Sequence, residues 1–148
     1  MKTYFDHEKL NVYQASVRFN GWVGELLAQV GGKAAVKDQL DRAATSIPLN
    51  LAEGNGKFSI KDRARYVDIA RGSALESAAC LDVLLSRKLA AEDRVIAGKE
   101  QLVEIVSMLM GLLRRLGYDF EARTWSAVVR EDAAAYAGGE QEQEQDKE

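Results

Sequence analysis

Residues 42–57 read RAATSIPLNLAEGNGK and place a proline inside a helical pattern. The apolar residues of this stretch recur at helical spacing, yet the stretch contains Pro48, the only proline of the 148-residue chain. Proline has no backbone N–H, so the carbonyl of Ala44 loses its usual partner one turn earlier. Thr45 or Ser46 can ease this cost by donating a side-chain hydrogen bond to a carbonyl of the preceding turn.

The same stretch also carries polar residues on the side that can meet the next helix. We predict that Glu53 pairs with Arg71 and that Asn50 bonds a backbone group across the same seam. The predicted structural network consists of Arg42, Asn50, Glu53, Arg71 and Glu76. A ligand site is the alternative interpretation. We favour the network because the surroundings are apolar and no nucleophile or metal ligand joins them.

The composition and periodicity of the whole chain predict an all-α domain. Glycines follow most of the periodic segments, and Ser59 with Asp62 three residues later resembles a capping box. The expected helices span residues 6–30, 33–53, 59–89 and 92–116. Val17 is expected on the inner face of the first and Ile69 on that of the third. The inner face of the second is expected to hold Val36, Leu40, Ala43, Ala44, Ile47 and Leu51. We place the helical domain at 1–120, a short helix or extension at 121–137, and a disordered acidic tail at 138–148.

The last long helix is more apolar than one buried stripe requires. Leu102, Ile105, Leu109, Leu112 and Leu116 would fill one seam. The apolar residues left on a second face are Val103, Val106, Met110 and Leu113. We interpret this second face as a contact with another subunit. The alternative is that the helix lies deep within its own core.

Catalytic and metal-binding patterns are weak in this chain. His7 is the only histidine and lacks the context of a triad, and Cys80 falls on the small apolar face of a helix as a core thiol. Residues 54–57 superficially resemble a phosphate-binding loop but lack its spacing. Glu53 and Glu76 are the only suggestion of a carboxylate pair. We therefore predict no enzyme activity, catalytic residue, metal or cofactor.

The basic residues carry more information than the net charge of −3. Residues 131–148 hold one basic and seven acidic residues, so residues 1–130 are mildly basic. Lysine and arginine at helical spacing can follow a row of phosphates, in a salt-sensitive and weakly sequence-specific manner. An ordinary solvated face is the alternative. The candidate nucleic-acid-binding residues are Lys57, Lys61, Arg63, Arg65, Arg71, Arg114 and Arg115.

The single cysteine and the absence of a long apolar stretch place the protein in the cytoplasm, with no membrane association. Two functions of different classes fit the sequence. The first is a non-catalytic oligomer that binds the backbone of RNA or DNA. The second is an oligomeric scaffold whose partner is a protein. A third, weaker hypothesis is an enzyme that uses Glu53 and Glu76.

Four motifs in order closely resemble one known family. They are FDHEKLNVYQ at 5–14, the stretch at 42–57, YVDIARGSALE at 66–76, and LGY at 116–118. The chain resembles the 23S ribosomal RNA intervening-sequence proteins, which are related to the accessory variability determinant proteins of diversity-generating retroelements. The resemblance implies an up-down four-helix bundle that assembles as a homopentameric ring, with nucleic-acid binding in the retroelement relatives. For most members it implies no biochemical activity.

Overall fold

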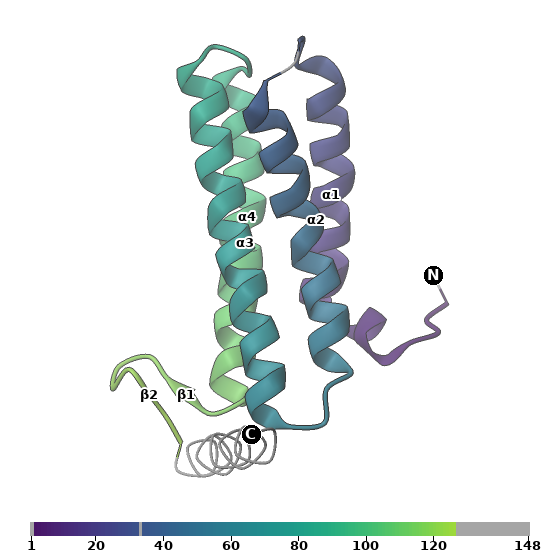
Figure 1. The fold of residues 1–148 in the computed structure, drawn as a ribbon, viewed down its shortest axis with the longest axis vertical. Helices are drawn as coiled ribbons and strands as arrows, with labels where there is room; N and C mark the ends of the chain where they lie inside the picture. The colour runs from purple at the N-terminus through teal and green to yellow at the C-terminus, as the bar shows by residue number, and fades with distance from the viewer. Residues whose placement is uncertain (1, 33, 127–148) are drawn as a thin grey trace, which may run out of the picture.

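Antiparallel helices make the body of the protein (Figure 1). A computed structural model describes residues 2–32 and 34–126. Within that part of the chain, the four α-helices are α1 (Asn11–Gln29), α2 (Ala35–Asn55), α3 (Ile60–Ser86) and α4 (Glu92–Arg115). Each helix packs against the next, and α4 also returns to α1. The expected all-α four-helix bundle is therefore the fold of the described residues.

The N-terminal boundary differs from the prediction of one helix starting at residue 6. A short 3-10 helix, η1 (Asp6–Lys9), comes first, and Leu10 is extended with ψ 124° before α1 begins. The side chain of Glu8 caps the start of η1, because its Oε2 accepts hydrogen bonds from the backbone amides of Tyr4 and Phe5 at 2.6 and 2.5 Å. The Ser59 cap is confirmed, since its Oγ accepts from the Asp62 amide at 3.1 Å.

The core follows the predicted faces with two errors. Every residue predicted for the inner face of α2 is buried: Val36, Leu40, Ala43, Ala44, Ile47 and Leu51. Val17 and Ile69 were expected inside, but their side chains are 47% and 41% exposed. The buried face of α1 instead runs through Phe19, which is fully buried. A bulky aromatic ring therefore sets the rotation of α1 about its axis.

Pro48 lies inside α2, and its effect on the backbone is compensated from a neighbouring helix. The Ala44 carbonyl, which residue 48 would normally bond, accepts a hydrogen bond from Asn20 Nδ2 of α1 at 2.8 Å. The same amide nitrogen donates to the Ser16 carbonyl at 2.8 Å. Thr45 Oγ1 donates to the Asp41 carbonyl at 2.5 Å, as predicted. Helix α2 consequently continues past the proline to Asn55.

Two glycines permit close approach between helices. A Cβ on Gly54 of α2 would lie 2.5 Å from the Cβ of Tyr66 of α3. A Cβ on Gly98 of α4 would lie 2.4 Å from the Cη2 atom of Trp22 of α1. Real Cβ atoms do not approach so closely, because interiors are already packed to the density of organic crystals. Any larger residue at either position would push the helices or side chains apart.

The segment after α4 begins as a hairpin, so in residues 121–126 the extension, and not the short helix, of the prediction is found. Two short strands, β1 (Tyr118–Asp119) and β2 (Thr124–Trp125), pair antiparallel, with Tyr118 opposite Trp125. Asp119 stabilises the turn, because its Oδ1 accepts from the amides of Glu121 and Ala122 at 2.9 and 3.0 Å. The predictions for residues 127–137 and for the tail at 138–148 lie outside the described residues.

Candidate nucleic-acid interface

The predicted Glu53–Arg71 pair does not form. Arg71 binds Asp68 of its own helix, with Nη2 and Nε at 3.0 and 3.1 Å from the same carboxylate oxygen. Glu53 is exposed and accepts a hydrogen bond from the hydroxyl of Tyr66 at 3.4 Å. Arg71 pairs with Asp68 because Asp68 lies three residues before it, so α3 itself holds the two groups together.

The prediction that Asn50 bonds backbone across the seam is also wrong. Asn50 Nδ2 donates to the backbone carbonyl and the Oγ of Ser46, at 2.8 and 2.9 Å, within its own helix. The link between α2 and α3 is made instead by Ser73, whose Oγ donates to Ser46 Oγ at 2.8 Å. Asn50 therefore orients the serine that carries the interhelical bond.

A third, separate group joins Arg42 to Glu76 through a residue that the prediction missed. Arg42 Nη2 donates to Gln39 Oε1 at 3.2 Å, and Gln39 Nε2 donates to Glu76 Oε1. Glu76 thus meets α2 at Gln39, whereas Glu53 lies fourteen residues further along α2. That separation is about 21 Å along the helix axis, too far for the two carboxylates to act as a pair.

The other residues considered for catalysis or metal binding, Cys80 and His7, pack against neighbouring side chains. Cys80 is 6% exposed. Burial is the main cause that raises the pKa of its thiol, and the nearby charge of Glu76 raises it further. His7 contacts the rings of Phe5 and Tyr13. Among residues 2–32 and 34–126, no cluster of His, Cys, Asp or Glu could hold a metal ion. The same residues include no helix long and apolar enough to cross a bilayer.

The seven predicted basic residues divide into groups according to their place in the fold. Lys57 precedes α3, and its Nζ lies 5.2 Å from the centre of the Tyr66 ring. Its carbonyl accepts a hydrogen bond from Arg63 Nε at 2.7 Å. Lys61 and Arg65 lie on one face of α3, at a spacing of four residues. Only this last pair keeps the predicted helical spacing.

A second basic group gathers where α2 and α4 end and α1 and α3 begin, which we call the lower end (Figure 1). Arg63 lines one hollow together with Leu10 and Leu112. Lys9 and Arg115 line an adjoining hollow of about 360 Å³ that shares these two leucines. The fold therefore brings Arg63 and Arg115 to the same end. It adds Lys9, which no motif or spacing singled out.

The hairpin builds a third basic group around aromatic rings. The Tyr118 ring lies 4.7 Å from Phe120 and 4.8 Å from Trp125, edge to face in both cases. The Arg114 guanidinium lies 5.0 Å from the centre of the Phe120 ring. A cleft of about 580 Å³ opens beside these rings. Its lining residues are Asp68, Arg71, Leu113, Tyr118, Phe120, Arg123 and Trp125.

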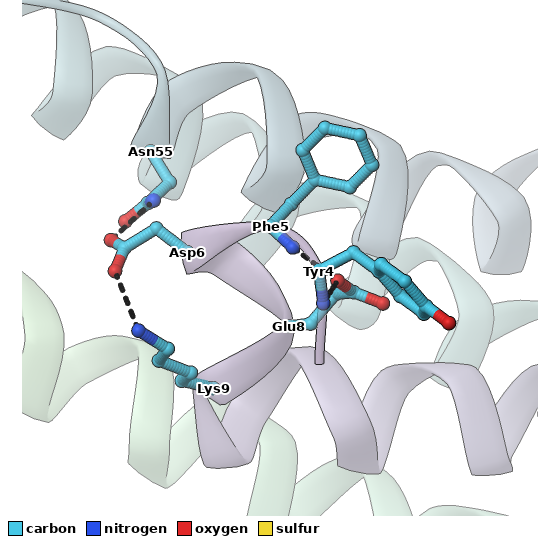
Figure 2. A network of polar contacts seen from close by, with 6 residues as sticks. All are labelled: Tyr4, Phe5, Asp6, Glu8, Lys9 and Asn55. Atoms are coloured by element: carbon cyan, nitrogen blue, oxygen red, sulfur yellow. Dashed lines mark hydrogen bonds and ion pairs between the residues drawn. The ribbon is translucent and has the colours of Figure 1, made fainter. Parts of the chain in front are cut away.

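Polar contacts fasten the N-terminus to the lower end (Figure 2). Asp6 Oδ2 accepts from Asn55 Nδ2 of α2 at 3.0 Å, and Asp6 Oδ1 lies 3.8 Å from Lys9 Nζ. The Asn55 hydrogen bond lowers the pKa of Asp6, and the charges of Lys9 and Arg63 lower it further. The backbone amides of Phe5 and Tyr4 lower the pKa of Glu8.

The predicted second face of α4 is only partly available to another subunit. Val103 is 67% exposed, while Val106 and Met110 are half-buried. Leu113 is 3% exposed and belongs to the core of its own bundle, which corrects its assignment to an interface. Ile96, one heptad before Val103, is 48% exposed and extends the apolar surface.

Residues 8–111 match the family model described as 23S rRNA-intervening sequence protein. The chain belongs to this family. The matched region contains the proline stretch and ends before the hairpin. A crystal structure of a protein of unknown function from the S23 ribosomal protein family of Bacteroides thetaiotaomicron VPI-5482 is similar, with a TM-score of 0.66 and 21% identity. The similarity covers 69% of this chain and 97% of that one, and it shows the shared fold. No curated protein matches the chain.

The depressed carboxyl pKa values predict that acid releases the N-terminal segment. A carboxylate whose pKa is lowered by folding stabilises the folded state above its unfolded pKa and loses this effect as pH falls through the folded value. We expect hydrogen exchange at the Tyr4 and Phe5 amides to accelerate below about pH 4 relative to the intrinsic rate.

Replacing Glu8 isolates the group responsible. In Glu8→Gln, the amide protection of Tyr4 and Phe5 should already be reduced at pH 7, because a neutral amide oxygen is a weaker acceptor than a carboxylate. The matched control is Glu104→Gln, which changes an exposed residue of α4 and should leave both amides protected. Equal protection in the two variants would contradict the assignment. NMR-detected exchange measures it.

Proposed function

We propose that this protein is a non-catalytic, cytoplasmic homo-oligomer that binds the backbone of RNA or DNA through its lower end. The observation that carries the proposal is the convergence of Lys9, Arg63 and Arg115 from three segments around two adjoining hollows. Cations that converge from separate elements can neutralise several phosphates at once and release their counterions. Lys9, Arg63 and Arg115 are all exposed, so phosphates can reach them.

The polar groups of the predicted structural network support a binding role over a catalytic one. Asn50 bonds a serine of its own helix, and Glu76 is held by Gln39. Glu53 is bonded to Tyr66, and Arg71 to Asp68. These contacts account for the polar side chains as groups that connect or orient helices. A non-catalytic bundle is therefore the function that agrees with their geometry.

The apolar surface of α4 supports oligomerisation. Ile96, Val103 and Met110 follow one another at intervals of seven residues, so they lie on one face of the helix. Burying such a stripe against another copy removes apolar area from water, which is the main favourable term in most association. A homopentameric ring, implied by the family resemblance, is the assembly we propose. A scaffold for a different protein is the alternative that the same surface favours.

The nucleic-acid proposal predicts a specific loss in Lys9→Gln/Arg115→Gln. Binding to a duplex of about 20 base pairs should weaken, and the slope of log K against log salt should become shallower by up to about 2, because two phosphate contacts are lost. Arg87→Gln/Lys88→Gln removes the same charge at the opposite end and should retain the wild-type slope. Fluorescence anisotropy across a salt series measures both quantities.

Two results would overturn this proposal. One is the absence of wild-type binding to RNA or DNA at about 50 mM salt, where electrostatic binding is strong. The other is binding that does not change with salt.

The oligomer proposal predicts that Val103→Glu dissociates the assembly. A carboxylate in the centre of an apolar contact loses hydration without gaining a partner. Light scattering should move from an oligomer mass toward the 16.3 kDa of one chain. Leu49→Glu is the matched control, because Leu49 is 62% exposed on α2, and it should leave the mass unchanged. A wild-type protein that is already monomeric would refute oligomerisation.

A further inference from the structure

The cleft beside the hairpin differs in chemistry from the rest of the lower end. Its walls combine the guanidinium groups of Arg71 and Arg123 with the rings of Tyr118, Phe120 and Trp125. Its volume of about 580 Å³ lies within the range of small-molecule binding sites. The hairpin lies beyond residue 111, where the family match ends. The cleft therefore joins two residues of the matched region, Asp68 and Arg71, to aromatic residues that lie beyond it.

The aromatic cluster leaves its ring surfaces partly accessible. Tyr118, Phe120 and Trp125 are all half-buried, and each packs against the bundle core on one side. Tyr118 meets the other two rings at interplanar angles of 77° and 64°, so neither contact is a parallel stack that would cover a whole ring face. Partly exposed aromatic faces are the surfaces on which unpaired bases stack.

Three guanidinium groups lie close to these rings. Asp68 holds the Arg71 guanidinium through two nitrogens at the wall of the cleft. Arg123 is exposed at the hairpin turn with φ 53°, a left-handed conformation that is uncommon for a residue with a side chain. Arg114 adds a third guanidinium, over the Phe120 ring.

We propose that this cleft binds an unpaired nucleobase of single-stranded RNA or DNA. The base stacks on the aromatic cluster, and its neighbouring phosphate contacts Arg71 and Arg123. This inference rests on the proposed nucleic-acid function and adds that the protein prefers single strands. A duplex cannot use the cleft, because its bases are already paired and stacked.

The test compares a labelled oligouridylate of about ten nucleotides with a duplex of the same length, since base stacking applies only to the single strand. Phe120→Leu removes a ring and keeps an apolar side chain. Arg123→Gln removes a charge at φ 53°, and Lys88→Gln is its matched control, a cation with φ 58° at the opposite end. Thermal unfolding followed by circular dichroism verifies that each variant is folded.

We expect the wild-type protein to bind the oligouridylate more tightly than the duplex. Phe120→Leu should weaken oligouridylate binding about tenfold and leave duplex binding unchanged, because only the single strand stacks on the ring. Arg123→Gln should weaken the oligouridylate more than the duplex, and Lys88→Gln should behave as wild type.

The outcomes separate this inference from the function on which it rests. If both variants bind the oligouridylate as tightly as wild type while duplex binding persists, the cleft proposal is wrong and the backbone proposal stands. Equal losses for single strand and duplex would also overturn it, since they reflect general charge. If neither probe binds at about 50 mM salt, both proposals fail. Uridine monophosphate that competes as well as the oligouridylate would overturn strand binding and make the free nucleotide the ligand.

Discussion

The hydrogen bond from Asn20 Nδ2 to the Ala44 carbonyl is the interaction on which the arrangement of the helices depends. Pro48 takes away the backbone donor of that carbonyl, and Ala44 is fully buried, so water cannot replace it. The bond fixes α1 against α2 at the level of the proline. Further along α2, the Ser46–Ser73 hydrogen bond and the close approach of Gly54 to Tyr66 fix α2 against α3. One stretch of sequence thus specifies both neighbours of α2.

This division of labour separates the bundle from the proposed ligand surface. Arg42, Asn50 and Glu53 of the proline stretch form bonds within α2 or between α2 and α3, and their geometry serves packing. The proposed ligand groups lie at the lower end, and the aromatic ones follow the region that matches the family. A shared fold can carry different functions at different sites on its surface.

Sequence periodicity was sufficient for the helices and for most of the core, because burying one face of a helix leaves a repeating pattern. It could not identify Asn20 as the partner of Ala44, since an amide in the middle of a helix has no signal of its own. The Glu53–Arg71 prediction failed because Asp68 offers Arg71 a partner on the same helix. The hairpin was missed because strands of two residues carry no readable alternation, and its cleft exists only after Tyr118 and Trp125 pair. Leu113 was misplaced because α4 turns it toward the core.

A double-mutant cycle on Asn20 and Pro48, followed by denaturant unfolding, tests most directly whether the proline stretch is a folding device. Asn20→Ala should lower the free energy of unfolding by about 1–3 kcal/mol, because it leaves a buried carbonyl without a donor. In the Pro48→Ala background residue 48 regains an N–H that can bond the Ala44 carbonyl. We predict that the loss of unfolding free energy caused by Asn20→Ala is then smaller by about 1 kcal/mol. Equal costs in the two backgrounds, within about 0.5 kcal/mol, would contradict it.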